Sequence, residues 1–358
     1  IYGCLVGSEM CIRDSFPSSP TIGVGFNENL AWGATVNKPD LVDIFALTTN
    51  AKEPDKYLLD GRWRSFRKKT IKLKVKLFGF LPWQVKRKAL YTEHGPAIET
   101  PHGIYAIRYA GMGEVKQIEQ WLAMNKAANF EEWLAALAQH TFASFNFVYS
   151  DKDGNIAFIH NSMTPVRIPG YNWHNYLPGD KSSLIWDSYI SFEKLPMVIN
   201  PSSGYLISAN QSPFFVTSDK DNPDRKNYSN EDGFPTRMTN RAVRGLELLS
   251  ELDKIDEQTF SDIKHDKKYS KNSRAYKYLE KAMLADLGDL NTQKHEIYAN
   301  AQTILKKWDL STDKNNRGAA LGTCIIGAEW LAEQQGENPP DPSGELKRCT
   351  DLLLDKIG

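Results

Sequence analysis

Cysteine, net charge and long apolar runs are scarce in this 358-residue sequence. Of the four cysteines, two lie in the first fifteen residues, and the remaining Cys324 and Cys349 are too few for a disulfide framework or a zinc site. Because 44 basic side chains balance 44 acidic ones, the total charge gives no electrostatic reason to expect nucleic acid or a membrane as partner. No apolar run is long enough to cross a bilayer. The composition is that of an ordinary globular protein.

The first fifteen residues differ in character from the rest of the chain. Read back into codons, residues 4–15 fit a transposase-type sequencing adapter translated in frame. The alternative is a genuine N-terminus or the remains of a signal sequence, but Glu9, Arg13 and Asp14 interrupt the apolar core that an export signal needs. We therefore expect residues 1–15 to be an adapter artefact and the real sequence to begin near Phe16, as a fragment of a longer protein.

The pattern of the remaining chain changes near residue 235. Up to that point, short β-type runs alternate with Gly, Pro, Asn and Asp turns. The predicted strands cover 21–26, 43–48, 71–78, 104–110, 145–149, 155–160 and 204–209, and two helices are expected over 113–125 and 130–139. Beyond it, apolar residues at three- and four-residue spacing predict helices over 237–252, 256–264, 273–287, 292–308, 319–334 and 344–357. We predict one α+β domain, with 16–235 mainly strands and 236–358 mainly helical.

A basic run occupies residues 62–76, where Lys and Arg alternate in part with apolar side chains. Period-two alternation of this kind is typical of a strand with one solvated face. The run is therefore interpreted as the solvated face of a strand pair, with an anion site as the alternative.

Five sequence blocks carry a family resemblance when they are taken together and in order. They are GFNENLAWGATVN at 25–37 followed by DLVDIF at 40–45, HGP at 94–96, SFNFVYSD at 144–151 followed by DGNI at 153–156, NPSSGY at 200–205, and NQSP at 210–213. In this order they resemble the β-chain of penicillin acylases and of relatives that deacylate homoserine lactones and lipopeptides. The resemblance covers roughly residues 16–330.

The resemblance implies an N-terminal-nucleophile hydrolase, an αββα sandwich of two stacked antiparallel sheets between helical layers, here partial and followed by a helical C-terminal region. In that family a precursor cleaves itself, and a new N-terminal Ser, Thr or Cys attacks an amide carbonyl with its own α-amine as base. An α-amine titrates near pH 8, so it can accept the hydroxyl proton without a histidine. The nucleophile of such chains lies upstream of the Trp32-Gly33 block, so we expect this fragment to lack it.

Three residues match family positions that stabilise the charge formed during catalysis. The resemblance makes the backbone N–H of Val36 and the side-chain amide of Asn210 the donors to the oxyanion that forms on the attacked carbonyl. Arg241 falls near a family arginine that supports the site electrostatically. Taken alone, each has a plainer interpretation: a valine in a sheet, a turn asparagine before Pro213, and a solvated charge on a helix.

Ala34 and Phe145 match positions that line the acyl pocket, which should be apolar and shaped. Phe145 is bulkier than the aliphatic residue of some relatives, which would alter the preference for acyl chains. The alternative is that both are core residues.

Asp40, the carbonyl of Val42 and Asp43 match a calcium-binding segment of the family, and Asp219 or Asp221 is the candidate for a further carboxylate. Calcium takes six to eight oxygen ligands, so a short acidic turn plus a distant aspartate is suitable chemistry. The alternative for Asp40 and Asp43 is a turn at the start of a strand. One structural calcium ion and no organic cofactor are expected.

These matches predict an amidohydrolase that cleaves a linear amide through an acyl-enzyme, with a penicillin, an N-acyl-homoserine lactone or a lipopeptide side chain as substrate. The rival is a noncatalytic homologue that binds acylated ligands. The expected partners are a small-molecule amide and the missing α-chain and β-chain start of the same precursor, with no nucleic acid and no membrane span. By itself this fragment should be inactive. Family members are usually exported, so the expected location is periplasmic or extracellular.

Overall fold

The centre of the structure is an antiparallel hairpin whose two strands are covered on both faces. The computed structural model describes residues 21–252, 254–289 and 291–357, so the adapter predicted over 1–15 lies outside the described residues. Strands β10 (Ser144–Asp151) and β11 (Ile156–Ser162) pair over nearly their whole length. Consecutive residues such as Phe147 and Val148 are both buried, which is typical of a strand covered on two sides.

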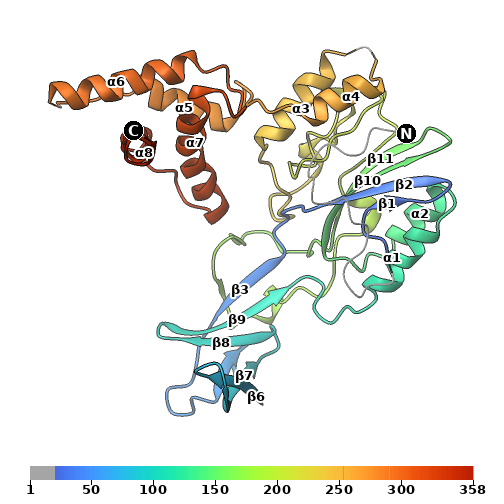
Figure 1. Cartoon of the computed structure of the whole chain (residues 1–358). Coiled ribbons are helices and arrows are strands. Elements are labelled where there is room, and N and C mark those ends of the chain that lie inside the picture. The colour runs from blue at the N-terminus through green and yellow to red at the C-terminus, as the bar shows by residue number, and fades with distance from the viewer. Residues whose placement is uncertain (1–20, 253, 290, 358) are drawn as a thin grey trace.

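The hairpin belongs to a five-stranded antiparallel sheet of order β1-β2-β10-β11-β13 (Figure 1). The other members are β1 (Gly25–Phe26), β2 (Leu30–Thr35) and β13 (Met197–Ile199). Helices α1 (Gln117–Lys126) and α2 (Phe130–Leu137) cover one face, where Trp121 and Trp133 pack on Phe147. On the opposite face, Val148 and Phe158 pack against residues of the segment that follows β13.

A second sheet has the order β12-β3-β9-β8-β7-β6 and is antiparallel except for the β12–β3 pair. Its strands are β3 (Val42–Leu47), β6 (Arg67–Leu77), β7 (Leu81–Tyr91), β8 (Pro96–Thr100), β9 (Gly103–Tyr109) and β12 (Leu177–Pro178), and a separate pair is formed by β4 (Lys56–Leu59) and β5 (Arg62–Ser65). This sheet has its own hydrophobic cluster around Phe45 and Trp173. This cluster is separate from the one that lies under α1 and α2.

The C-terminal part is helical, as its spacing predicts. It contains α3 (Asn240–Ser250), α4 (Glu257–Lys264), α5 (Arg274–Leu284), α6 (Thr292–Lys307), α7 (Arg317–Gln335) and α8 (Pro342–Ile357). The last four pack around Tyr278, Leu305 and Ile325 and form the red and orange group of Figure 1. Cys324 and Cys349, too few for a framework, do form one disulfide, which joins α7 to α8. None of the described helices has the length and apolarity to span a membrane.

Two predicted strands are wrong or shortened. The strand expected over 204–209 is a loop, because its backbone finds partners within the same segment: Ile207 N–H donates to the carbonyl of Val216, and Tyr205 O accepts from the Thr217 hydroxyl. The strand expected over 21–26 is reduced to β1. The basic run lies on β5 and β6, whose residues are all exposed, and each of these strands belongs to a different pair: β5 pairs with β4, and β6 pairs with β7.

Candidate active site

The segment after β13 is a loop that is fixed by its own side chains and that ends in Asn210. Buried Gln211 accepts the backbone N–H of Ala209 at 2.6 Å and donates to the carbonyl of Ile207 at 2.8 Å. Asn210 has a φ of +63°, in the left-handed region that asparagine adopts more readily than most residues. The loop therefore holds the backbone of Asn210 in one orientation.

The side-chain amide of Asn210 joins the other two predicted catalytic residues. Its Nδ2 donates to the backbone carbonyl of Val36 at 2.7 Å, and its Oδ1 accepts from Nη2 of Arg241 at 2.6 Å. Because a guanidinium can only donate, the oxygen of the amide must face Arg241 and the nitrogen must face away from it. The second N–H of Nδ2 has no acceptor among the described residues. The structure thus brings Val36, Asn210 and Arg241 together, with one amide hydrogen left to donate.

Arg241 lies in the first turn of α3, whose start is bound to the Asn210 loop. Thr239 caps the helix by accepting the N–H of Ala242, and its hydroxyl donates to the carbonyl of Ala209 at 3.1 Å. Although part of the Arg241 side chain is exposed, desolvation by the surrounding protein lowers its pKa. A guanidinium remains charged nonetheless, so Arg241 supplies a fixed positive charge behind the amide of Asn210.

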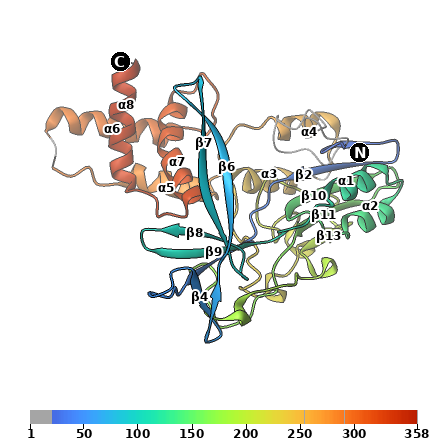
Figure 2. The same ribbon diagram turned by 90° about the horizontal axis from the view of Figure 1, so that it is seen from below.

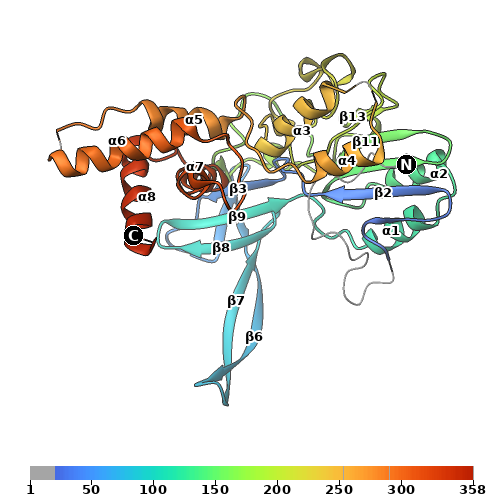
Figure 3. The same ribbon diagram turned by 45° about the horizontal axis from the view of Figure 1, so that its top comes forward.

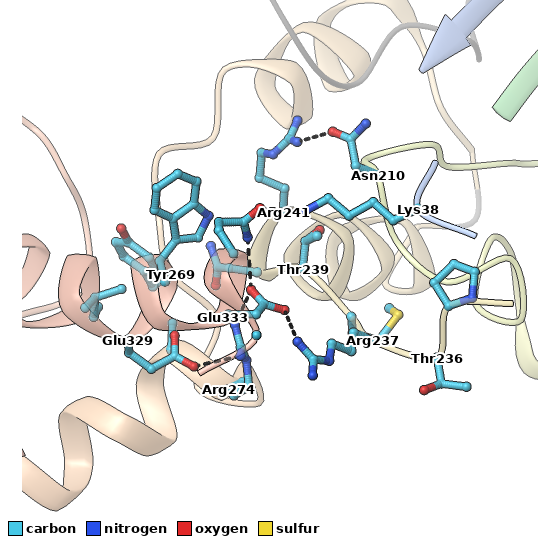
Figure 4. Close-up of a pocket in the computed structure, with 18 of the residues that line it drawn as sticks. Lys38, Asn210, Thr236, Arg237, Thr239, Arg241, Tyr269, Arg274, Glu329 and Glu333 are labelled. Carbon is cyan, nitrogen blue, oxygen red and sulfur yellow. Dashed lines mark hydrogen bonds and ion pairs between the residues drawn. The ribbon is translucent and has the colours of Figure 1, made fainter. Parts of the chain in front are cut away.

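Asn210 and Arg241 line a cleft of about 1440 Å³ between the sheet region and α7 (Figure 4). Figure 4 shows Lys38 on one side, and its Nζ reaches Oε1 of Gln334 on α7 at 2.5 Å. On the α7 side, Arg274 contacts Glu329 at 2.9 Å and Glu333 at 2.5 Å. Burial raises the pKa of Glu329, an effect that Arg274 opposes. The cleft is large enough for a drug-sized ligand, and both acidic and basic side chains line it.

The two predicted acyl-pocket residues lie on the face of the five-stranded sheet that α1 and α2 cover. Ala34 pairs with Phe147 in the β2–β10 register, and the ring of Phe145 packs edge-on against Trp121 at a centroid distance of 5.8 Å. Both side chains are half-buried members of the same apolar cluster, and neither lines the cleft of Figure 4. Since Thr35 pairs with Asn146, Phe145 lies one step further along the ladder, at the strand end where Val36 follows β2.

The predicted calcium segment holds an arginine between its two carboxylates. Arg167, almost fully buried, donates from Nε to Oδ2 of Asp43 at 3.1 Å and lies 3.4 Å from Oδ1 of Asp40. Burial raises the pKa of the Asp43 carboxyl, and the positive charge of Arg167 offsets only part of this rise. Of the other two carboxylate oxygens, Asp43 Oδ1 is buried without a hydrogen-bond partner, whereas Asp40 Oδ2 lies 3.3 Å from Nδ1 of His174. Val42, whose carbonyl was expected to bind calcium, begins strand β3 between the two aspartates and is about half exposed.

The distant carboxylate predicted for the same site does not join it. Asp219 is exposed in the 3₁₀ turn η4 (Asp219–Asp221), and the carboxylate of Asp221 instead accepts from Ser202, Ser203 and Ser218. No cluster of three or more His, Cys, Asp or Glu suited to a metal occurs in the described part of the chain. The free Oδ1 of Asp43 is a suitable ligand for a cation, but the described residues supply too few ligands for calcium.

Sequence reasoning missed Arg167, Thr239 and Gln211. Thr239 carries a recognisable signal, because Thr directly before an apolar-periodic segment is a helix N-cap. Arg167 carries none, since only the fold brings it to aspartates more than 120 residues away. Gln211 is a polar residue whose burial follows from the loop itself.

Comparison with known proteins gives the same family as the motifs. The family model described as penicillin amidase matches residues 14–337. Penicillin G acylase of Escherichia coli is 30% identical over 246 residues, which cover 67% of this chain and 26% of that protein. Acyl-homoserine lactone acylase PvdQ of Pseudomonas syringae pv. tomato is 24% identical over 369 residues, which cover 92% of this chain and 46% of that protein. The chain therefore spans a quarter to a half of the length of these relatives.

A solved structure of a thermostable penicillin G acylase from Alcaligenes faecalis matches with a TM-score of 0.65 at 22% sequence identity, covering 91% of this chain and 57% of that one. At this identity the match establishes the fold, which is the N-terminal-nucleophile hydrolase fold of penicillin acylases, with the predicted α+β class. Since the family model also covers most of the sequence, the chain belongs to the penicillin amidase family.

Proposed function

We propose that this chain carries the oxyanion-binding part of an acylase that cleaves linear amides. The observation that carries the proposal is the amide of Asn210, oriented by Arg241 and left with a free N–H beside Val36. A donor held in place before the reaction stabilises a developing oxyanion without the cost of reorganisation. Family membership supports the same reaction class.

In the proposed mechanism a Ser, Thr or Cys at a free N-terminus, contributed by a segment outside these 358 residues, attacks the amide carbonyl. Its α-amine, with a pKa near 8, takes the proton of the nucleophile and passes it to the leaving amine. The tetrahedral oxyanion receives hydrogen bonds from Asn210 and from the backbone N–H of Val36, while Arg241 holds the amide of Asn210. Collapse expels the amine and leaves an acyl-enzyme, which water hydrolyses to the acid.

The acyl group of the substrate is proposed to bind beside Ala34 and Phe145, on the apolar face under α1. The rings of Trp121 and Phe142 next to Phe145 support an apolar chain or ring there. Penicillins, N-acyl-homoserine lactones and lipopeptides all meet this requirement. A noncatalytic homologue that binds acylated ligands is the second candidate, and the residue at the nucleophile position distinguishes the two.

Replacement of Asn210 in the complete precursor tests the proposal. We expect Asn210→Ala to lower kcat for amide cleavage by about 10²–10³-fold with a small change in KM, because the lost hydrogen bond is needed mainly in the transition state. Asn175→Ala, at an exposed asparagine outside the cleft, is the matched control. Unchanged kcat in a folded Asn210→Ala enzyme would refute the role of Asn210.

The 358-residue chain alone should turn over no amide. Incubation with an acylating inhibitor followed by peptide mass spectrometry should find no labelled residue in the range 16–358. A covalently labelled side chain in that range, together with turnover, would place the nucleophile inside the chain and contradict the proposal.

We also propose a calcium ion near Asp40, Val42 and Asp43, completed by ligands from outside the described residues. The unpartnered Oδ1 of Asp43 supports it, and the bound ion would add to Arg167 in offsetting the charge of the two neighbouring carboxylates. Calcium should raise the melting temperature of the complete protein but not of its Asp40→Asn variant. The same rise in both proteins would count against this site. A periplasmic or extracellular location is proposed as well, and the Cys324–Cys349 disulfide supports an oxidising compartment.

A further inference from the structure

The hairpin formed by β6 and β7 projects far from the rest of the molecule (Figures 2 and 3). The two strands pair along their full eleven residues, from Arg67↔Tyr91 to Leu77↔Leu81. Strand β8 pairs only with the base of β7, at Leu90 and Tyr91, so the outer part of the hairpin has no other strand beside it. All residues from 71 to 80 are exposed.

The two faces of this hairpin differ in chemistry. Cross-strand pairs on one face are apolar: Leu73 lies opposite Val85, and Leu77 lies opposite Leu81. The opposite face presents lysines, with Lys72 directly opposite Lys86. The apolar set is Ile71, Leu73, Val75, Leu77, Leu81, Trp83 and Val85, with Arg67, Lys69 and Arg87 on the same face toward the base, and the basic set of the opposite face is Lys68, Lys72, Lys74, Lys76, Lys86 and Lys88. A patch of apolar side chains of this extent, exposed on one face, marks an interaction site.

The charge of the hairpin is one-sided, although the whole chain is balanced. Residues 67–91 contain nine Lys and Arg residues and no Asp or Glu, whereas the chain as a whole has 44 of each sign. Among the described residues, only Lys68 of the basic set forms an ion pair, with Asp55 at the base of the hairpin. The unpaired lysines therefore produce a local positive field that favours an anionic partner.

The tip of the hairpin is aromatic where a turn residue would be less strained. Phe78 and Gly79 both have positive φ, +52° and +80°, in a turn that usually has Asn-Gly or Asp-Gly. The exposed fractions are 87% for Phe78, 76% for Phe80 and 57% for Trp83. Bulky apolar side chains at the outermost point, followed by lysines, match the pattern of proteins that insert into the interface of a membrane.

We propose that the β6–β7 hairpin attaches the protein to the surface of an anionic phospholipid bilayer. Phe78, Phe80 and Trp83 would enter the headgroup region, and the lysines along the shaft would contact the lipid phosphates. Complementary charge selects this occupant, because nine cations without an acid suit an anionic surface. The aliphatic side chains along the shaft favour a bilayer over nucleic acid, because phosphates and stacked bases would leave these side chains in water, whereas the interface of a bilayer would bury them.

Sedimentation with vesicles tests the proposal on the 358-residue chain. We expect binding to vesicles of phosphatidylglycerol and phosphatidylcholine, at least about 10-fold weaker binding to phosphatidylcholine alone, and loss of binding between about 50 mM and about 500 mM salt. A tip variant, Phe78→Ser with Phe80→Ser and Trp83→Ser, and a shaft variant, Lys72→Gln with Lys74→Gln and Lys76→Gln, should each lose at least about 10-fold in binding.

Two matched control variants should bind like the unmodified chain. Val115→Ser with Leu284→Ser and Leu352→Ser removes exposed apolar residues elsewhere, and Lys264→Gln with Lys277→Gln and Lys314→Gln removes exposed lysines elsewhere. Circular dichroism of all variants shows whether they are folded. Equal binding to both vesicle types, or equal losses in tip and control variants, would overturn the proposal.

The complete precursor provides the decisive comparison, because the remainder of the protein could cover the apolar face instead. Acrylamide quenching of tryptophan fluorescence is compared between the unmodified complete protein and its Trp83→Phe variant. The difference between the two gives the quenching of Trp83 and shows whether the tip is accessible to solvent. An accessible Trp83 and vesicle binding by the complete protein support the proposal. A shielded Trp83 without vesicle binding would show that the hairpin is an internal interface and would overturn it.

Discussion

At the scale of single residues, the amide of Asn210 links a strand end, a loop and a helix start. Its predicted neighbours, Val36 and Arg241, could be named from sequence only because motifs in family order aligned them. Their contacts depend on features that no pattern carries, such as the positive φ of Asn210 and the hydrogen bond from Thr239 to the carbonyl of Ala209. The sequence thus named the residues, but it could not predict the contacts that bring them together.

A buried histidine gives the protein a pH dependence at this scale. His94, which the HGP block contributes, packs against Phe45 at a centroid distance of 4.6 Å, and neither ring nitrogen has a hydrogen-bond partner. Burial, reinforced by Arg108, lowers its pKa from 6.5 to about 4. The unfolded chain therefore binds a proton first as the pH falls, so His94 destabilises the fold progressively between pH 6.5 and about 4.

Replacement of this histidine should remove that acid sensitivity. The pKa difference corresponds to about 3 kcal/mol of the free energy of unfolding. In urea unfolding experiments at pH 7 and near pH 4, His94→Phe should lose less stability than the unmodified chain. His160, with a pKa lowered to about 3 by burial, stays in both proteins and serves as the common background. An identical pH dependence in the two proteins would contradict the assignment.

At the scale of elements, helical periodicity predicted α3 to α8 closely, because each helix has an apolar side to bury. The failures are physical as well. The apolar run at 204–209 looked like a strand, but side chains such as Gln211 satisfy its backbone in a loop. Strand β7 was missed because Pro82 and four consecutive non-apolar or small residues after Val85 obscure its alternation.

The contact of α7 with Trp308 depends on a glycine. A Cβ on Gly322 would lie 2.1 Å from Cζ3 of Trp308, whereas a Cβ on Gly327 of the same helix would meet nothing within 4 Å. We expect Gly322→Ala to destabilise the protein by about 1–3 kcal/mol through overpacking. Gly327→Ala should stabilise it by about 0.5–1 kcal/mol, because alanine is the better helix former.

Denaturant unfolding of the two alanine variants checks this pair. They change the same atoms in the same helix, so propensity alone predicts the same sign for both. Equal stabilisation by the two substitutions would show that Trp308 does not pack on α7 at Gly322.

At the scale of the whole molecule, the C-terminal helices form one hydrophobic cluster that the disulfide closes. The composition excluded a disulfide framework, but it could not show that two cysteines 25 residues apart meet across α7 and α8. Cys324→Ala with Cys349→Ala should lower the free energy of unfolding by about 3 kcal/mol, because the bond restricts the unfolded chain.

A reducing agent provides the control for this prediction. Reduction should destabilise the unmodified chain by a similar amount and leave the double variant unchanged. If reductant left the free energy of unfolding of the unmodified chain unchanged, or if the double variant were as stable as the unmodified chain, the disulfide would not be stabilising.

The charge balance of the whole chain also concealed a feature of its parts. Equal totals of acidic and basic residues pointed away from a charged partner, yet nine cations without an acid lie in residues 67–91, and the strand register places six of them on one face of a projecting hairpin. Composition describes the sum of a molecule, whereas its surface is determined by register and topology.

The most direct test of the proposed role of Asn210 is a crystal structure of the complete protein with a bound analogue of the tetrahedral intermediate of amide cleavage. We expect Asn210 Nδ2 to lie about 2.7–3.1 Å from the oxygen that replaces the oxyanion, with Oδ1 still bound to Arg241. An analogue oxygen held by other donors, with Asn210 Nδ2 bonded only to the Val36 carbonyl, would contradict it.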